Sequence, residues 1–264
     1  MSTLARGTDA PRCRIGQAVR VTKTSRRLDG SDDGALLSLF GAIASRDQLT
    51  IARRLKQAPG LATRPIRIGA TRQDPDRYFL PEIRHYVYAG DTALHVTAAA
   101  HQREVAESLV AQGADVRARN RRGAEPLHYA ADGSPGTDFW DPIAQRDVIT
   151  YLIEAGARPD AKDKSGVAPL HRAVRTRSSD AVSALIENGA DPRLTNKSGS
   201  TPLHLAVQNT GRSESGSEAA KDEQRRIIAL LLRHGASPTD VDANGKTVAA
   251  TASSDWIRQL LDNC

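Results

Sequence analysis

The sequence is poor in aromatic residues and in cysteine. Aromatic side chains make up 4% of the 264 residues, whereas hydrophobic residues make up 39%, so alanine, leucine, valine and isoleucine have to form most of the core. Such small side chains suit helices that pack closely side by side. The two cysteines, Cys13 and Cys264, lie near opposite ends of the chain and show neither metal-ligand spacing nor a disulfide framework. This cysteine content indicates a reducing compartment, and we expect a cytoplasmic protein.

Long apolar runs and catalytic motifs are also missing. No run reaches the ~18 apolar residues that a membrane-spanning helix needs, and the N-terminus lacks the uninterrupted apolar stretch of a secretory signal. The sequence has no phosphate-binding glycine loop, no nucleophile elbow and no His-Glu-x-x-His pattern. We therefore expect neither a membrane protein nor an enzyme, and the sequence indicates no cofactor.

Positive charge is concentrated in the N-terminal third. The net charge is +6, but residues 1–90 hold 16 Lys or Arg against 8 Asp or Glu, and residues 91–264 hold 21 against 23. Residues 1–33 are basic with little apolar periodicity, which predicts a disordered tail; a transit peptide is the alternative. The tail could bind nucleic acid electrostatically, but it has no aromatic residues for base stacking and no DNA-binding motif. Nucleic acid is therefore the less favoured partner.

One four-residue motif recurs along the rest of the chain. Its copies are Thr92–His95 (TALH), Glu125–His128 (EPLH), Ala168–His171 (APLH), Thr201–His204 (TPLH) and a decayed Thr247–Ala250 (TVAA). Their starts lie 33, 43, 33 and 46 residues apart. A basic period of 33 residues, lengthened twice by an insertion, indicates an array of one stacked supersecondary unit. Such arrays provide extended binding surfaces rather than a single deep pocket.

The same local signals surround each copy. A turn glycine precedes the motif at Gly90, Gly123, Gly166, Gly199 and Gly245. A second apolar stretch ends in Gly-Ala at Gly113, Gly156, Gly189 and Gly235. Proline in the first helical turn and glycine just past the last one are typical of helix ends, and this glycine can take the left-handed conformation that satisfies the last carbonyls. Each unit is therefore predicted to hold a turn and two short helices.

The segment before the first regular unit is less periodic. Apolar residues at helical spacing from Ala35 to Leu55, interrupted at 45–47, predict two short helices that end at Pro59-Gly60 and cap the array. Residues 61–87 form an irregular segment whose three prolines argue against helix. This stretch and Tyr88 hold four of the chain's ten aromatic residues, so we expect the segment to pack on the array or on a partner.

These units resemble the ankyrin repeat in their Thr-Pro-Leu-His opening, helix–turn–helix pattern and Gly-Ala-Asp stretch. The resemblance covers about residues 35–264, extends to a set of bacterial ankyrin-repeat proteins, and implies an all-α solenoid of about five to six helix–turn–helix units with short turn or hairpin fingers. After the tail, the implied segments are 34–60 (cap), 61–87 (irregular), 88–119, 120–162, 163–195, 196–241 and 242–264 (truncated cap). The chain departs from the ankyrin pattern at Thr97, and at His101 and Arg177, where glycine is usual between the helices.

Two patterns suggest metal sites that we do not expect. Four histidines recur in register, at His95, His128, His171 and His204. Neighbouring copies in stacked helices would lie about 10 Å apart, too far for shared Zn–N bonds of ~2 Å, and in ankyrin repeats this histidine hydrogen-bonds backbone groups of the adjoining turns. Residues 240–245 match half of a calcium loop, but Thr251 occupies the position of its bidentate glutamate.

A column of turn residues is the best candidate for a binding surface. Two positions before each turn glycine the units read Tyr88, Arg121, Lys164, Lys197 and Ala243, and two positions earlier they read Tyr86, Arg119, Lys162, Thr195 and Val241. Arg122 adds to the column, and Arg172 and Arg175 lie on the adjoining inner helix. In ankyrin arrays these turn residues point from the concave edge and vary with the partner. We expect a basic ridge with two tyrosines at one end, although a merely solvated face remains the alternative.

The two insertions, 132–146 and 209–224, are expected between the first and second helices of their units. Trp140 in the first could anchor an interface or fold back onto the neighbouring unit, and both alternatives stay open. Residues 211–217 read as a flexible polar loop.

The sequence thus predicts a monomeric, non-enzymatic scaffold that binds an acidic patch on another protein. Tyr86, Tyr88 and Tyr129 are expected to be its apolar anchors. Inhibition of a partner enzyme by the same surface is an alternative.

Overall fold

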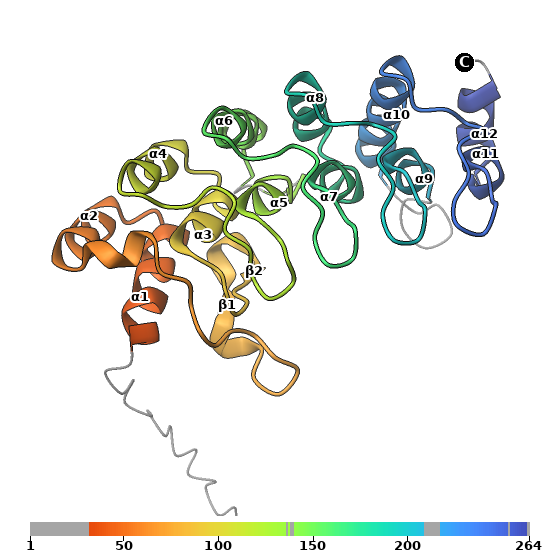
Figure 1. Cartoon of the computed structure of the whole chain (residues 1–264). Helices are drawn as coiled ribbons and strands as arrows, with labels where there is room; N and C mark the ends of the chain where they lie inside the picture. Colours follow the sequence, from red (N-terminus) through yellow and green to blue (C-terminus); the bar gives the residue numbers. More distant parts are fainter. Residues whose placement is uncertain (1–31, 136, 138–139, 209–216, 253, 263–264) are drawn as a thin grey trace, which may run out of the picture.

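The repeated units form a stack of helix pairs in two layers (Figure 1). The computed structural model describes residues 32–135, 137, 140–208, 217–252 and 254–262. The inner layer consists of α1 (Asp32–Ala44), α3 (Ala93–Ala99), α5 (Pro126–Ala130), α7 (Pro169–Thr176), α9 (Pro202–Ala206) and α11 (Val248–Thr251). The outer layer consists of α2 (Gln48–Gln57), α4 (Arg103–Ala111), α6 (Pro142–Glu154), α8 (Ser179–Glu187), α10 (Glu218–Arg233) and α12 (Asp255–Asp262). Each inner helix packs on its neighbours in the layer, as α3 does on α1 and α5, and α4, α6, α8 and α10 pack in succession in the outer layer. One apolar core runs between the layers. Among the described residues, no helix is long and apolar enough to cross a bilayer.

The motif histidines close the start of the inner helices and link each unit to the next. Nδ1 of His95 accepts a hydrogen bond from Thr92 N–H (3.2 Å), and Nε2 lies 3.1 Å from the carbonyl oxygen of Ala124 in the following unit. His128, His171 and His204 repeat the arrangement with the carbonyl oxygens of Val167, Ser200 and Lys246, at 3.0, 3.1 and 3.3 Å. The structural role that the resemblance implies for these histidines is confirmed.

Burial of these histidines predicts that the protein loses stability in mild acid. Desolvation lowers the pKa of the motif histidines His95 and His171. It also lowers the pKa of the motif histidine His128, and of His101 in the turn between two helices, to about 4 from the usual 6.5. Between pH 6.5 and pH 4 the unfolded chain binds protons at these histidines and the folded chain does not. The free energy of unfolding is therefore at its full value above pH 6.5 and falls as the pH drops toward 4. Each of His101 and His128 contributes a loss of roughly 3 kcal/mol over that window.

Urea unfolding at pH 7.5 and pH 5 measures this effect. His101→Asn is the informative variant, because asparagine tolerates the left-handed backbone of this position and removes one titrating group. Its stability should depend less steeply on pH than that of the wild type. An equal slope for both proteins would show that His101 does not contribute.

The turns between paired helices keep a left-handed backbone without glycine. Arg46, His101 and Arg177 have φ values of 57°, 49° and 58°. Nε2 of His101 lies 3.2 Å from the carbonyl oxygen of Ala130, and the Arg46 guanidinium donates to the carbonyl oxygen of Ala100 at 2.9 Å. The departures from the ankyrin pattern at His101 and Arg177 therefore preserve the turn, and the Arg46 and His101 side chains form bonds to the next unit.

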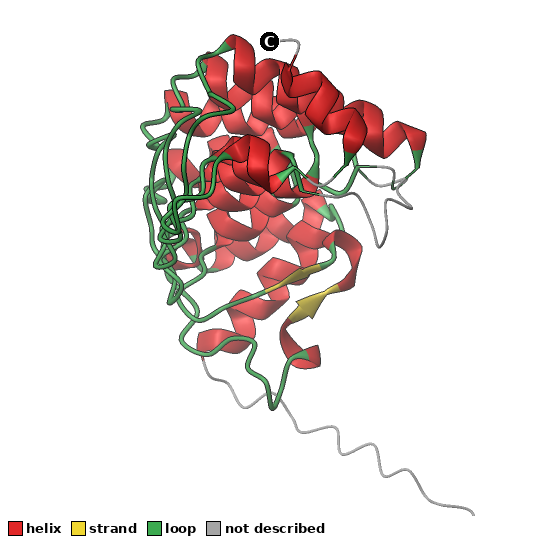
Figure 2. Cartoon of the chain, turned by 90° about the vertical axis from the view of Figure 1, so that its right-hand side faces the viewer, coloured by secondary structure: helices red, strands yellow, loops and turns green. Residues whose placement is uncertain are grey.

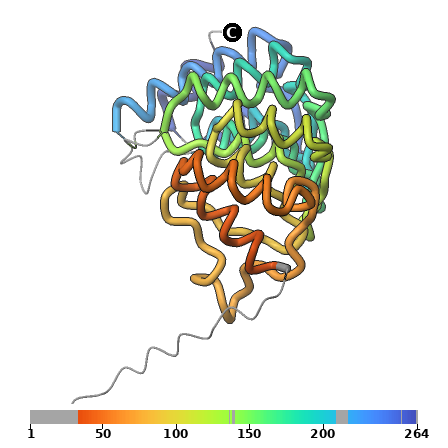
Figure 3. The backbone as a smooth tube through the Cα atoms, turned by 90° about the vertical axis from the view of Figure 1, so that its left-hand side faces the viewer, coloured from red at the N-terminus to blue at the C-terminus, as the bar shows by residue number. Residues whose placement is uncertain are grey.

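The irregular segment packs on the array rather than standing free. Its larger buried side chains are Leu61, Ile66, Tyr78, Leu80 and Val87. Strand β1 (Phe79–Leu80) pairs antiparallel with β2 (His85–Tyr86) across the single helical turn Pro81–Ile83. Figures 2 and 3 show the segment at the N-terminal end of the stack. Of the two expectations for its aromatic residues, packing on the array is confirmed.

Parts of the expected insertions extend outer helices instead. Residues 142–146 begin α6, which Asp141 caps, and residues 218–224 begin α10, which Ser217 caps. The long insertion ranges 132–146 and 209–224 therefore need correction, because capping side chains start the helices earlier. Residues 209–216 and 1–31 lie outside the described residues, and with them almost all of the expected polar loop and basic tail; α1 already begins at Asp32.

Candidate functional site

The turns before the inner helices project as fingers that bind one another. Arg121 N–H donates to Ala89 O (2.8 Å), and Lys164 N–H donates to Arg122 O (2.9 Å). The series continues with Lys197 N–H to Ser165 O (3.2 Å) and Ala243 N–H to Ser198 O (3.1 Å). Figure 2 shows these loops stacked along one edge of the molecule. The expected alignment of the finger column is therefore confirmed.

A side-chain oxygen shapes four of the five fingers from within. Oδ1 of Asp163 accepts hydrogen bonds from Ser165 N–H (2.8 Å) and Val167 N–H (3.0 Å). Asn120, Asn196 and Asp242 hold the same place in their fingers. Hydrogen bonds from the N–H groups of Lys246 and Asn244 lower the pKa of Asp242. The carboxylate of the half calcium loop thus accepts bonds from its own turn, and among the described residues no acidic, histidine or cysteine cluster is arranged to hold a metal ion.

Three lysines of the column have no ion-pair partner among the residues that the structure describes. Lys162, Lys164 and Lys197 are exposed, and within the described residues no carboxylate forms an ion pair with them. Hydrogen bonds to neighbouring fingers hold the backbone of these lysines in place, so their ammonium groups extend from an ordered backbone. These lysines form what we call the lysine ridge.

The finger arginines are held by local contacts. The Arg121 guanidinium donates to the carbonyl oxygen of Ala70 and lies 5.5 Å from the centre of the Tyr88 ring, while the Arg122 guanidinium lies 4.0 Å from the same ring. Nε of Arg119 donates to Gly123 O at 3.1 Å. Arg121 and Arg119 therefore stabilise the fold as well as facing solvent, whereas no carboxylate of the described chain pairs with Arg122.

The two inner-helix arginines are partly neutralised. The side chain of Arg172 is 11% exposed and lies 2.8 Å from Asp132 and 3.5 Å from Asp163. Arg175 lies 3.5 Å from Asp132 but remains 63% exposed. Of the two, only Arg175 can reach a partner without first breaking a buried ion pair.

Tyr129 is not available as a surface anchor, and this expectation was wrong. Its side chain is 1% exposed, and its hydroxyl donates to both carboxylate oxygens of Asp91 (2.9 and 3.0 Å). The His85 ring covers it at 4.4 Å between ring centres. Burial, followed by the charge of Asp91, raises the pKa of Tyr129 well above 10.0, so the hydroxyl stays neutral.

The other aromatic candidates are partly accessible. Tyr86 is 37% exposed and packs on Phe79, with 4.8 Å between ring centres. Tyr88 is half-buried beneath the finger arginines. Trp140 is also half-buried, and its Nε1–H donates to Gln145 Oε1 at 3.0 Å. Trp140 thus folds back, and its hydrogen bond is to its own unit, whereas the sequence suggested the neighbouring one.

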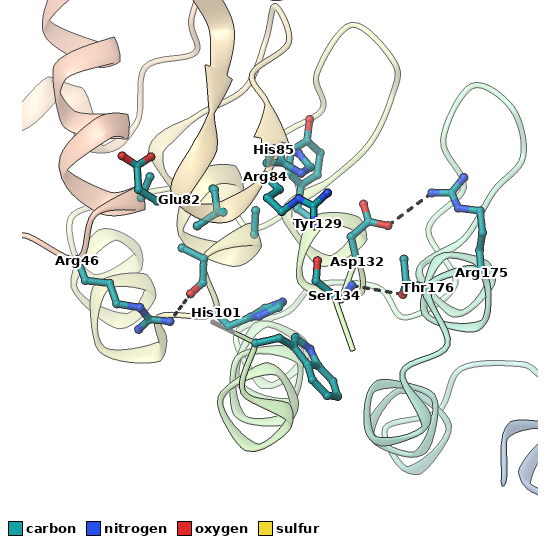
Figure 4. Close-up of a pocket in the computed structure, with 16 residues that line it drawn as sticks. Arg46, Glu82, Arg84, His85, His101, Tyr129, Asp132, Ser134, Arg175 and Thr176 are labelled. Carbon is teal, nitrogen blue, oxygen red and sulfur yellow. Dashed lines mark hydrogen bonds and ion pairs between the residues drawn. The ribbon is translucent and has the colours of Figure 1, made fainter. Parts of the chain in front are cut away.

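The irregular segment and the inner helices enclose a cavity of about 680 Å³. Its lining joins Tyr86, Tyr88, Arg121, Arg122, Lys164, Arg172 and Arg175 with three residues that the sequence did not single out, Arg84, His85 and Asp132. A second cavity of about 280 Å³ adjoins it (Figure 4). Lys162, Lys197, Arg119 and Trp140 lie outside the larger cavity, and Trp140 lines the smaller one. Arg84 and His85 were missed because the irregular segment has no repeat register.

Comparison with protein families identifies the repeated units. A family model described as "Ankyrin repeats (3 copies)" matches residues 143–215. A model described as "Ankyrin repeat" matches residues 89–121 and 198–243, and together the matches span half of the chain. No curated protein matches the chain.

Proposed function

Because the chain belongs to the ankyrin-repeat family, whose repeats are generally protein–protein interaction modules, we propose that it binds a partner protein through its fingers and inner helices. The observation that supports this proposal is the lysine ridge. Lys162, Lys164 and Lys197 lack ion-pair partners among the described residues, although the fingers that carry them are joined by hydrogen bonds. A complementary acidic patch on the partner would neutralise them and speed association.

The proposed role is non-enzymatic, and the ridge serves a scaffold and an inhibitor equally well. Either activity requires only that a partner be held against the surface. Whether the partner's active site is covered depends on the partner, so the primary experiment concerns the surface itself.

Charge reversal of the ridge should abolish capture of the partner. We expect Lys162→Glu/Lys164→Glu/Lys197→Glu to lose proteins that the wild type retains in a pull-down from native host lysate, compared by quantitative mass spectrometry. Loss of about tenfold or more is expected, because each charge pair of an interface is replaced by repulsion. Arg121 is left unchanged, since its bond to Ala70 holds the irregular segment.

The matched control reverses three exposed cations on outer helices, Arg53→Glu/Lys56→Glu/Arg233→Glu. It changes the net charge equally and should keep the partner. Retention of every captured protein by the ridge variant, with an unchanged salt dependence, would remove the lysine ridge as the binding surface.

A further inference from the structure

The two cavities adjoin and form one groove, and His85 is among the residues that line both. They share Arg84, His85, Tyr129, Asp132 and Arg175 in their linings. Figure 4 shows Arg84, His85 and Tyr129 together at one edge of the smaller cavity, with Asp132 directed toward Arg175. The groove therefore runs between the irregular segment on one side and helices α5 and α7 on the other.

The larger cavity has an excess of positive charge. Six cations line it (Arg84, Arg121, Arg122, Lys164, Arg172 and Arg175) against two carboxylates (Asp132 and Asp163). Both carboxylates lie within ion-pair distance of Arg172, at 2.8 and 3.5 Å. No carboxylate of the described chain pairs with Arg84, Arg121, Arg122 or Lys164. A groove with this lining favours an anion.

Cationic side chains of the cavity are placed so that they can bind an oxyanion. Arg122 lies 4.0 Å from the centre of the Tyr88 ring, so its guanidinium rests on an aromatic face. A guanidinium held in this way loses little freedom when it forms paired hydrogen bonds to a carboxylate or a phosphate. Arg84 and Lys164 have no side-chain hydrogen bond in the described structure and can turn toward the same anion.

The His85 side chain, which lines both cavities, has a polar atom without a hydrogen-bond partner among the described residues. The His85 ring stacks on Tyr129 at 4.4 Å, but its Nε2 atom is buried without a hydrogen-bond partner among the described residues. Buried polar atoms normally have a partner, and the stacking contact alone does not lock the ring. The smaller cavity has apolar lining from Ile83, Ala99 and Trp140 beside polar groups such as Arg46, Glu82 and His101.

We infer that this groove binds an extended segment of the partner protein, with a phosphate ester or a carboxylate in the larger cavity and an adjacent apolar side chain against Trp140. The larger cavity, about 680 Å³, is within the range of ~300–1,000 Å³ that is usual for ligand pockets, and it exceeds the needs of a single carboxylate. The inference rests on the proposed function and narrows it, from an acidic surface patch to an oxyanion held in a groove.

Peptide pools test the inference on the full chain. The probes are fluorescent nonapeptide pools with a fixed central serine, glutamate, phosphoserine or phosphotyrosine between random residues. We expect at least one anionic pool to bind about tenfold or more tightly than the serine pool, because hydrogen bonds to charged groups are the stronger ones. The ratio between glutamate and phosphorylated pools distinguishes the two sources of the oxyanion.

Two double variants locate the binding. Arg84→Gln/Lys164→Gln removes two groove cations without breaking a described side-chain bond and should lose most of the preference. The matched control Lys56→Gln/Arg233→Gln removes two exposed cations of outer helices, outside both cavities and the lysine ridge, and should keep it. Thermal melts of both variants check that each remains folded.

Three outcomes would overturn the inference. Equal binding of all four pools would exclude an oxyanion site, and a preference that survives Arg84→Gln/Lys164→Gln would place it elsewhere. Binding of phosphoinositide vesicles or random DNA through Arg84 and Lys164, without binding of the anionic pools, would exclude a peptide ligand. If the pools fail while the ridge variant still loses its partner, the proposed function stands and only the groove assignment falls.

Discussion

Asp91→Ala should lower the free energy of unfolding by about 3–5 kcal/mol, because it leaves several buried donors without an acceptor. Asp91 is 0% exposed and accepts hydrogen bonds from Tyr88 N–H (2.6 Å) and from Asn120 Nδ2 (2.9 Å) in the next finger. It also accepts from the Tyr129 hydroxyl at 2.9 Å. One carboxylate therefore joins the first finger to the next finger and to helix α5.

Urea unfolding at pH 7.5 measures this loss. Tyr129→Phe removes one donor and keeps the ring, so a smaller loss of about 1–2 kcal/mol is expected. Asp74→Ala, at an exposed position of the irregular segment, is the matched control and should change the free energy of unfolding very little. A loss below about 1 kcal/mol for Asp91→Ala would show that water can replace the network.

The same variant bears on the groove. Tyr129 lines both cavities, and His85 stacks on it. When Asp91 no longer fixes the Tyr129 hydroxyl, the ring on which His85 stacks is held less firmly. We therefore expect Asp91→Ala to weaken binding of anionic peptides more than its exposed control does.

Gly166→Ala should destabilise the protein by about 2–4 kcal/mol, since it adds strain and a collision. Gly166 has φ +75°, and a Cβ built on it would lie 2.7 Å from the backbone nitrogen of Lys197. That nitrogen donates to Ser165 O at 3.2 Å, so the collision falls on the bond that joins two fingers.

Two other glycines separate the causes. Gly189 has φ +91° but a Cβ there meets nothing within 4 Å, so Gly189→Ala should cost only the strain, about 1–2 kcal/mol. Gly41 lies inside α1 with open space around it, and Gly41→Ala should stabilise by about 0.5–1 kcal/mol through its helix propensity. Equal losses for Gly166→Ala and Gly189→Ala in denaturant titrations would contradict close packing between fingers.

Burial of Tyr129 illustrates the limit of prediction from the repeat pattern. Tyr129 follows the motif histidine, as Arg172 does in the next unit, and the pattern places both on an inner helix beside the fingers. The residues that cover Tyr129 come from the irregular segment, where His85 has no counterpart in other units. Arg84 was not predicted for the same reason: it lies in the irregular segment, and only the folded structure places it in one cavity lining with Arg121 and Arg122.

The sequence by itself determined the helix pairs, the finger turns, the role of the motif histidines and the ankyrin-repeat family. These features are periodic and depend on contacts within one unit or between neighbours, so each copy of the motif reports them again. Only the tertiary structure decided which cations remain free of ion-pair partners among the described residues, where the irregular segment docks and that a groove lies beneath it. Those outcomes depend on distances between side chains far apart in the chain, and Asp132 beside Arg172 is one such pair that the repeat period does not encode.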